Sequence, residues 1–226
     1  MLTRHTPSCL AAATLLLLAH SASQAVLLVP GVITPLPGTT SAAEPQLAGL
    51  VLEDKLFDYS MNTAKGLVTG QIQSRVVRSS VDGTLDFYWR VTNDPNSLDD
   101  VGYFRIGLFN APEYNSNYRI DGVGDLAPVS AFRFSGGQES YVNYAFFSTS
   151  PNGASSGLRP GQSSNFIFMD TSATQYVETA IMDVADFDTS HISTLHPTFT
   201  PGVPEPQTYG LMALGLLMLG ARRYRR

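Results

Sequence analysis

Few residues in this chain of 226 have side chains suited to catalysis or metal binding. Beyond residue 20 the only histidines are His191 and His196, whose five-residue spacing does not place them on one helix face. The one cysteine, Cys9, lies near the start. No H-E-x-x-H, G-x-x-x-x-G-K-[ST] or G-x-G-x-x-G motif occurs. We therefore expect a protein that is not an enzyme, with no catalytic residue, no metal site and no cofactor.

Two acidic clusters are the alternative to that expectation. One comprises Asp94, Asn96, Asp99 and Asp100, and the other comprises Asp183, Asp186 and Asp188. Their oxygens suit Ca²⁺, which takes 6–8 oxygen ligands. Neither cluster matches the D-x-[DN]-x-[DN]-G pattern, and Asp and Asn are also common turn residues. A pair of carboxylates also leaves a secreted glycoside-type hydrolase open, although the sequence does not show how far apart the two groups lie.

Aromatic side chains suggest a second kind of site. Some tyrosines alternate opposite the expected core face, where an exposed row of rings would stack on sugars. Tyr is also favoured in strands for its own sake. Binding of exopolysaccharide, as in an adhesin, is therefore an alternative function. The aromatic residues concerned are Tyr88, Trp89, Tyr103, Phe104, Tyr141, Tyr144, Phe146 and Phe147.

The N-terminal segment up to Ala25 has the layout of a secretory signal peptide. Met1 to Ser8 is polar and contains Arg4, and an uncharged apolar run follows from Cys9 to Ala19. The small residues up to Ala25 suit signal peptidase, so we predict cleavage between Ala25 and Val26. The apolar run is too short to span about 30 Å of hydrocarbon. A buried helix or an uncleaved anchor is the alternative, and cleavage would remove Cys9.

The C-terminal end of the chain has three parts in order. Val203, Pro204, Glu205 and Pro206 come first, a short apolar stretch runs from Tyr209 to Ala221, and an arginine cluster closes the chain. The prolines hold their backbone extended and remove two N–H donors, so the segment stays open to a protease. By the positive-inside rule the basic tail stays cytoplasmic and the body lies outside. The basic residues are Arg222, Arg223, Arg225 and Arg226.

This tail resembles the C-terminal sorting signal of the PEP-CTERM family of exported proteins of Gram-negative bacteria. All three family elements are present: Pro204-Glu205-Pro206, a single transmembrane helix and the arginine cluster. The resemblance implies that exosortase, a membrane cysteine protease, processes the chain and releases or transfers it to the cell surface. An ordinary single-pass anchor with a proline-rich stalk is the alternative. The bond that is cut does not follow from the resemblance.

The middle of the chain has the pattern of β-strands. Residues 26–49 are rich in proline and suggest an irregular leader or an edge strand. Asp82-Gly83 indicates a hairpin turn, after which Leu85, Phe87, Trp89 and Val91 alternate with polar residues. We predict an all-β fold, an antiparallel β-sandwich, with a closed barrel as the alternative. Further strands are expected at 101–109, 131–135, 141–147, 165–170 and 178–184. The segments DGTLDFYWRVTND and FIFMDTSATQYVETAIMDV also resemble members of the same family.

The charge of the predicted mature body and the division of the chain into segments indicate its partners and its location. Residues 26–203 carry 9 basic and 18 acidic residues, which disfavours a nucleic-acid partner. We divide the chain into a signal peptide (1–25), an exported β-sandwich domain (26–200) and a sorting signal (201–226). The expected partners are signal peptidase with the general secretion machinery, exosortase and, transiently, the membrane. The expected location is the cell surface or extracellular matrix, after export across the inner membrane.

Overall fold

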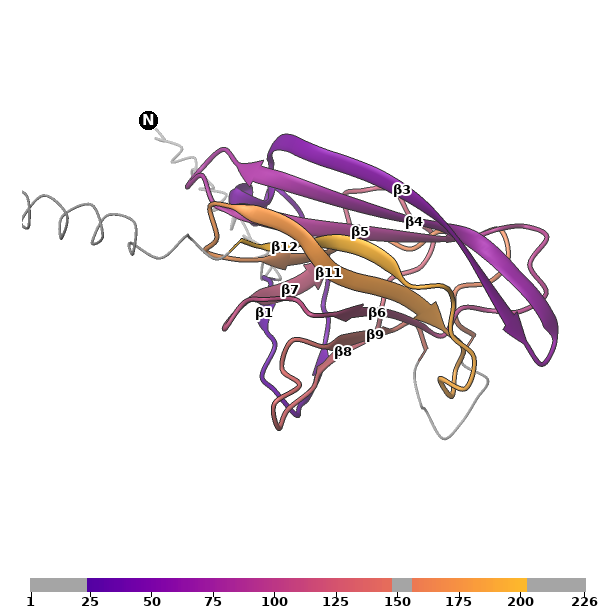
Figure 1. The fold of residues 1–226 in the computed structure, drawn as a ribbon. Helices are drawn as coiled ribbons and strands as arrows, with labels where there is room; N and C mark the ends of the chain where they lie inside the picture. Colours follow the sequence, from indigo (N-terminus) through magenta and orange to yellow (C-terminus); the bar gives the residue numbers. More distant parts are fainter. Residues whose placement is uncertain (1–23, 148–155, 203–226) are drawn as a thin grey trace, which may run out of the picture.

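Two six-stranded antiparallel sheets make up the body of the protein in a computed structural model that describes residues 24–147 and 156–202 (Figure 1). Sheet A has the order β1-β7-β10-β5-β4-β3, and sheet B has the order β12-β11-β6-β9-β8-β2. The strands of sheet A are β1 (Val26–Leu27), β3 (Gly49–Thr63), β4 (Gly66–Ser79), β5 (Leu85–Asn93), β7 (Asn115–Tyr118) and β10 (Ile167–Asp170). Those of sheet B are β2 (Ile33–Pro35), β6 (Tyr103–Gly107), β8 (Ser130–Arg133), β9 (Val142–Ala145), β11 (Tyr176–Ala185) and β12 (His196–Pro201).

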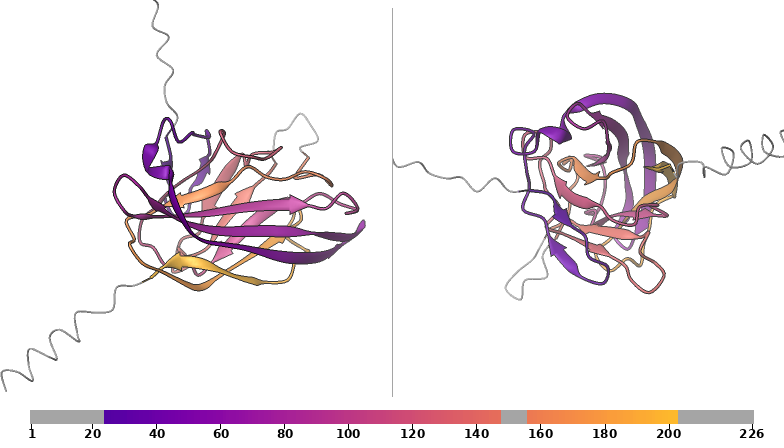
Figure 2. Two further views of the ribbon diagram at one scale, coloured as in Figure 1. Left: turned by 90° about the horizontal axis from the view of Figure 1, so that it is seen from above. Right: turned by 90° about the vertical axis from the view of Figure 1, so that its left-hand side faces the viewer.

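The predicted all-β fold with antiparallel sheets is confirmed, and the views in Figure 2 show the sheets on either side of the body. Within the described residues no helix is long and apolar enough to cross a membrane. The one helical segment there is the 3₁₀ turn η1 (Pro45–Leu47). Residues 1–23 of the predicted signal peptide, and the predicted transmembrane helix and sorting residues within 203–226, lie outside the described residues.

The core lies between the sheets and is rich in aromatic side chains. Trp89 from β5 is completely buried, with its ring centroid 6.1 Å from that of Phe104 on β6 and 6.0 Å from that of Phe109. Its indole N–H donates to Thr198 Oγ1 on β12 at 2.7 Å, so a buried polar group is satisfied across the two sheets. The predicted inward set of Leu85, Phe87, Trp89 and Val91 is confirmed, because each is fully buried.

The opposite face of β5 differs from the expectation of a solvent-facing polar row. Asp86 and Tyr88 are also buried, with exposed fractions of 0% and 4%. The cause is the segment around η1, whose Leu47 packs on Tyr88 in a small second core together with Val77 and Phe168. The Tyr88 hydroxyl donates to the Leu47 carbonyl at 2.8 Å. The proline-rich leader therefore covers part of sheet A.

Three of the strands in the described residues were absent from the sequence prediction: β3, β7 and β12. The predicted Asp82-Gly83 turn is confirmed: Gly83 has a φ of +77° and β4 pairs with β5 beginning at Arg78 and Leu85. The expected edge character of the leader is also confirmed, since β1 and β2 each lie at an edge of their sheet. Figure 1 shows the β3–β4 hairpin running along one side of the body.

Candidate functional site

The outer face of sheet B carries a group of aromatic side chains that we call the aromatic face. Alternation along β6, β8 and β9 points one set of residues inward and the other outward. The outward set is half-buried or exposed, and the rings pack edge to face in pairs: Phe132 with Phe134, and Tyr103 with Phe147, each at 5.0 Å between centroids. The members are Tyr103, Phe132, Phe134, Tyr141 and Phe147.

Two hollows adjoin on this face and share Asn143. The first, of about 490 Å³, is lined by Tyr103, Phe132 and Phe147 among others. The second, of about 430 Å³, is lined by Phe134 and Tyr141 and includes Arg105 and Asp183. Volumes of this size suit small organic groups such as single sugar rings. An apolar lining with a few polar groups is the usual composition of such sites.

Arg105 and Asp183 form a two-pronged ion pair in the second hollow. The strands β6 and β11 place them directly opposite each other. Arg105 Nε donates to Asp183 Oδ1 at 2.7 Å and Nη2 donates to Oδ2 at 2.6 Å. Asp183 is 4% exposed. A planar guanidinium held in this way is a rigid polar group, and its remaining N–H donors can bond other acceptors.

Of the predicted aromatic residues, Tyr103, Tyr141 and Phe147 belong to the aromatic face. The row of exposed tyrosines is wrong in its predicted form, because most of the predicted rings are buried. Tyr144, for example, has its hydroxyl 2.7 Å from Ser116 Oγ in the core. Phe132 and Phe134 were missed, although their i, i+2 spacing in a short strand was a usable signal. The buried members of the predicted set are Tyr88, Trp89, Phe104, Tyr144 and Phe146.

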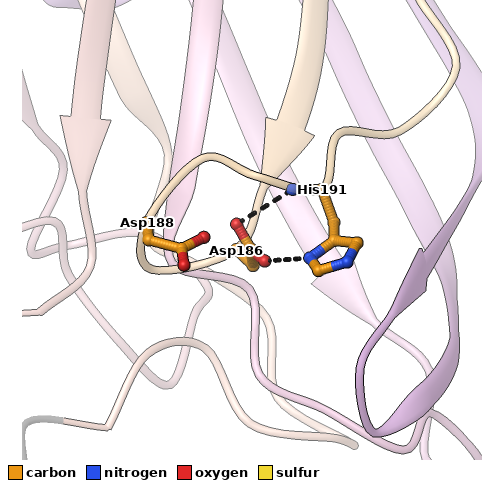
Figure 3. Close-up of side chains that lie close together, drawn as sticks. All are labelled: Asp186, Asp188 and His191. Atoms are coloured by element: carbon orange, nitrogen blue, oxygen red, sulfur yellow. Dashed lines mark hydrogen bonds and ion pairs between the residues drawn. The ribbon is translucent and has the colours of Figure 1, made fainter.

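The acidic cluster near the end of the chain is rearranged relative to the prediction. Asp183 is paired with Arg105, whereas Asp186 and Asp188 lie beside His191 in the loop between β11 and β12 (Figure 3). One ligand atom from each of these three residues lies within 4.8 Å of the others. His191 Nδ1 is 2.5 Å from Asp186 Oδ2, and the His191 amide donates to Asp186 Oδ1 at 3.3 Å.

The loop itself already supplies donors to these carboxylates. The Ser190 amide donates to Asp188 Oδ1 at 2.9 Å, and bonds from the Ser190 hydroxyl and amide lower the pKa of Asp188. Thr189 has a positive φ of 61° at the tip of the turn. Carboxylates that accept bonds from nearby backbone are typical of tight turns. The hydrogen bonds of the turn therefore explain the positions of these carboxylates.

The other acidic cluster lies in the loop after β5, and its carboxylates accept hydrogen bonds from different parts of the protein. Asp94 Oδ2 accepts a bond from the Thr69 hydroxyl at 2.9 Å, and Asp99 Oδ1 accepts one from Lys65 Nζ at 2.6 Å. Burial, followed by the neighbouring Asp99 charge, raises the pKa of Asp100. The fourth member, Asn96, is exposed. These residues do not form a common set of ligands in the described structure.

A pair of facing carboxyl groups, one buried and one half-buried, was not anticipated. Asp86 on β5 and Asp170 on β10 lie directly opposite each other, on the face covered by η1. Burial, followed by the Asp170 charge, raises the pKa of Asp86 to about 9, and burial also raises the pKa of Asp170. Both Asp86 oxygens are shielded from solvent, whereas Asp170 is half-buried. Burial and the facing Asp170 charge both favour the protonated form of Asp86.

The predicted cleavage pair lies within the described residues. Val26 begins β1 and pairs with Ser116 on β7, while Ala25 packs at the margin of the second core. The last described residue is Gly202, whose amide donates to the Gln175 carbonyl at 2.8 Å. The other predicted site residues lie outside the described residues: Val203, Pro204, Glu205 and Pro206, and the arginines at 222, 223, 225 and 226.

The chain thus combines an all-β body with a separate segment that starts where the last strand ends. That segment, residues 202–226, matches the family model described as the PEP-CTERM protein-sorting motif. The match confirms the resemblance seen in the tail of the sequence: residues 202–226 carry a PEP-CTERM protein-sorting motif. No curated protein and no solved structure matches the chain. The motif is consistent with export, a C-terminal anchor and cell-surface sorting, and it implies exosortase as the processing partner.

Proposed function

We propose that this protein is a non-enzymatic cell-surface or extracellular-matrix protein that an N-terminal signal peptide exports and that exosortase processes near Pro204-Glu205-Pro206. The observation that carries the proposal is the sorting motif at 202–226. Its position supports the proposal as well, because β12 ends at Pro201 and the motif follows directly. A protease can therefore cut in this segment and leave the folded body whole.

Substitution of the motif tests the sorting step. Replacing Pro204, Glu205 and Pro206 with alanine is expected to leave the chain full-length and bound to the membrane, because the extended recognition segment is lost. Replacing Gln207 and Thr208 with alanine is the matched control and should leave processing intact. The size of the protein in membrane and surface fractions is the measurement. Normal processing of the triple variant would reject the role of the motif.

A second candidate function, binding of exopolysaccharide, is favoured by the aromatic face and its two hollows. Partly exposed rings offer apolar surfaces to the C–H faces of sugars, while Asn143 and the Arg105–Asp183 pair offer polar contacts to hydroxyl groups. The site therefore combines both kinds of contact that a sugar ring makes.

Binding to glycans from the producing cell tests this candidate. Tyr141 is 38% exposed, so its replacement should cost little stability. Tyr141→Ala is expected to reduce retention of the processed protein on exopolysaccharide at least several-fold, whereas Tyr141→Phe should keep the ring and retain binding. Leu56→Ala, at an exposed position on sheet A, is the control. Equal retention of the Ala and Phe variants, or no retention of the wild-type protein, would dismiss glycan binding through this face.

A further inference from the structure

The start of the described chain is bound by a buried carboxylate. The Ala25 amide donates to both oxygens of Glu44, at 3.0 and 2.9 Å. Glu44 is 5% exposed and lies just before η1, and its other side-chain contact in the described structure is with Gln46 Nε2 at 3.5 Å. One neutral amide hydrogen shared between two oxygens is a weak counterpart for a buried negative charge.

Other carboxyl groups lie around Glu44. The Glu44 charge contributes to the raised pKa of Asp170, which places these two groups within electrostatic range, and Asp170 lies opposite Asp86. Asp86 is fully buried, and neither of its carboxyl oxygens has a hydrogen-bond partner among the described residues. Asp82 adds a further negative charge from the β4–β5 turn.

Arg119 is the cation that faces this group, and its guanidinium is already engaged. Arg119 Nε donates to Asp121 Oδ1 at 2.6 Å and Nη2 donates to Asp121 Oδ2 at 2.9 Å. Its Nη1 donates to the Leu47 carbonyl at 3.2 Å. Glu44 and Asp170 therefore lack a dedicated positive charge in the described structure.

We propose that Glu44 is the binding site for the amino group that signal peptidase creates at the start of the mature chain. The inference rests on the export step of the proposed function. Hydrolysis adds water across the bond between the Ala25 carbonyl carbon and the Val26 nitrogen. The carboxylate leaves with residues 1–25, and Val26 keeps an amino group that takes up a proton. The neutral amide on Glu44 is thus replaced by a cation with three N–H donors.

The backbone keeps the new amino group close to Glu44. Consecutive Cα atoms are about 3.8 Å apart, so the Val26 nitrogen starts one residue from the Ala25 nitrogen that Glu44 already binds. Val26 and Leu27 stay paired with Ser116 and Asn115, and the Leu28 side chain is 1% exposed in the core. Loss of residues 1–25 removes the peptide bond at the Val26 nitrogen, so the new amino group can turn an N–H toward the carboxylate while β1 stays in place. Cleavage of the signal peptide thereby adds an ion pair that holds the start of the mature chain against sheet A.

The test uses the full chain, exported by its host and isolated after processing. Mass spectrometry is expected to show Val26 as the first residue. An intact residue 1 would overturn the export proposal itself, whereas a new terminus elsewhere than Val26 would overturn only the docking inference. These two failures are therefore distinguishable by one measurement.

The ion pair is tested by the reactivity of the amino group. An ordinary α-amino group has a pKa of about 8, and each unit of increase lowers its reactive fraction about tenfold below that pKa. Acylation of the Val26 amine at about pH 7.5 is expected to be about tenfold slower in the folded protein than in the unfolded chain. Equal rates would contradict the proposal, and this readout needs no variant that might fail to fold.

Thermal unfolding of variants gives an independent test. A raised amine pKa stabilises the wild-type protein below about pH 8, and that contribution is lost as the pH rises through the folded-state value. Above about pH 8 the fall should be smaller in the processed Glu44→Gln variant, in which only the contribution of Asp86 remains. Glu113→Gln, an exposed position near β7, is the matched control and should keep the wild-type profile. A Glu44→Gln profile that falls like the wild-type profile would overturn the proposal.

Discussion

Asp86 places a carboxyl group, wholly shielded from water, on the face of sheet A that the leader covers. The groups facing it are Asp170 from β10, Asp82 from the preceding turn and Arg119, the one group among them that lowers its pKa. An ordinary Asp has a pKa of about 3.9, so the folded state keeps a proton that the unfolded chain releases. Between about pH 4 and pH 9 the folded state therefore binds more protons than the unfolded state, and stability falls as the pH rises.

Replacing this residue with its amide should remove that dependence. We predict that Asp86→Asn raises the free energy of unfolding at pH 8 by about 1–3 kcal/mol, because the amide needs no proton and can donate to Asp170. Denaturant unfolding between pH 5 and pH 9 is the measurement. Asp58→Asn, at an exposed position of β3, is the control. A variant with the wild-type slope would show that Asp86 is not the titrating group.

Thr198 joins the two sheets at a single hydroxyl group. It accepts the Trp89 indole N–H at 2.7 Å and lies 2.8 Å from Ser74 Oγ, and both partners are fully buried. Thr198→Val should leave the indole N–H without an acceptor and lower the free energy of unfolding by about 1–3 kcal/mol. Chemical denaturation followed by Trp89 fluorescence measures the change. Thr179→Val, exposed on β11, should change it by less than about 0.5 kcal/mol.

At the scale of elements, the β3–β4 hairpin depends on a glycine in β4. Gly70 lies between Tyr59 on β3 and Asn93 on β5. A Cβ there would come within 2.0 Å of the Thr92 carbonyl oxygen and 2.6 Å of the Tyr59 hydroxyl. Tyr59 uses that hydroxyl to bond the same Thr92 carbonyl, at 3.1 Å, so the ring is held close over the glycine.

Gly70→Ala should therefore destabilise the protein by about 1–3 kcal/mol or more, because neither the backbone oxygen nor the anchored ring can move away cheaply. Gly122→Ala is the matched control, since its Cβ would meet its nearest neighbour, Arg119 Cβ, at 3.6 Å. The comparison of the two denaturation midpoints is the measurement. Equal midpoints for the two variants would mean that the Tyr59–Gly70 contact is not tight in solution.

Strands with a regular alternation of apolar and polar residues were predictable from the sequence, and strands without that alternation were not. The alternation along 85–92 predicted β5, whose inward residues are all buried. β3 was missed because its pairing register shifts between Val51 and Glu53. The inward residue before the shift is the even-numbered Leu52, and those after it are the odd-numbered Phe57, Tyr59 and Met61. A shift of one residue breaks the period of two on which strand recognition depends.

β12 was missed for a different reason. Pro197 and Pro201 argue against a strand, yet β12 is an edge strand of sheet B, where a missing N–H is tolerated. The aromatic face was only partly predicted, since alternation within one strand does not show which residues meet across strands. The pairing of Asp86 with Asp170 likewise depends on the register of two strands that lie far apart in the sequence.

At the scale of the whole molecule, the folded body and the sorting motif meet directly. Gly202 is still bonded to the body through Gln175, and Val203 of the Val-Pro-Glu-Pro segment is the next residue. Residues 203–208 span at most about 20 Å even when extended. If Tyr209 begins the membrane segment, the end of the body near β12 lies close to the membrane until the tail is cut.

Processing by exosortase is the central claim, and one comparison tests it most directly. The full chain is expressed in otherwise identical cells with and without exosortase, and its size and location are followed in membrane, surface and medium fractions. We predict a shorter, surface or released form in cells with the protease and a full-length, membrane-bound form in cells without it. An unchanged membrane-bound form in both strains would contradict the proposed function.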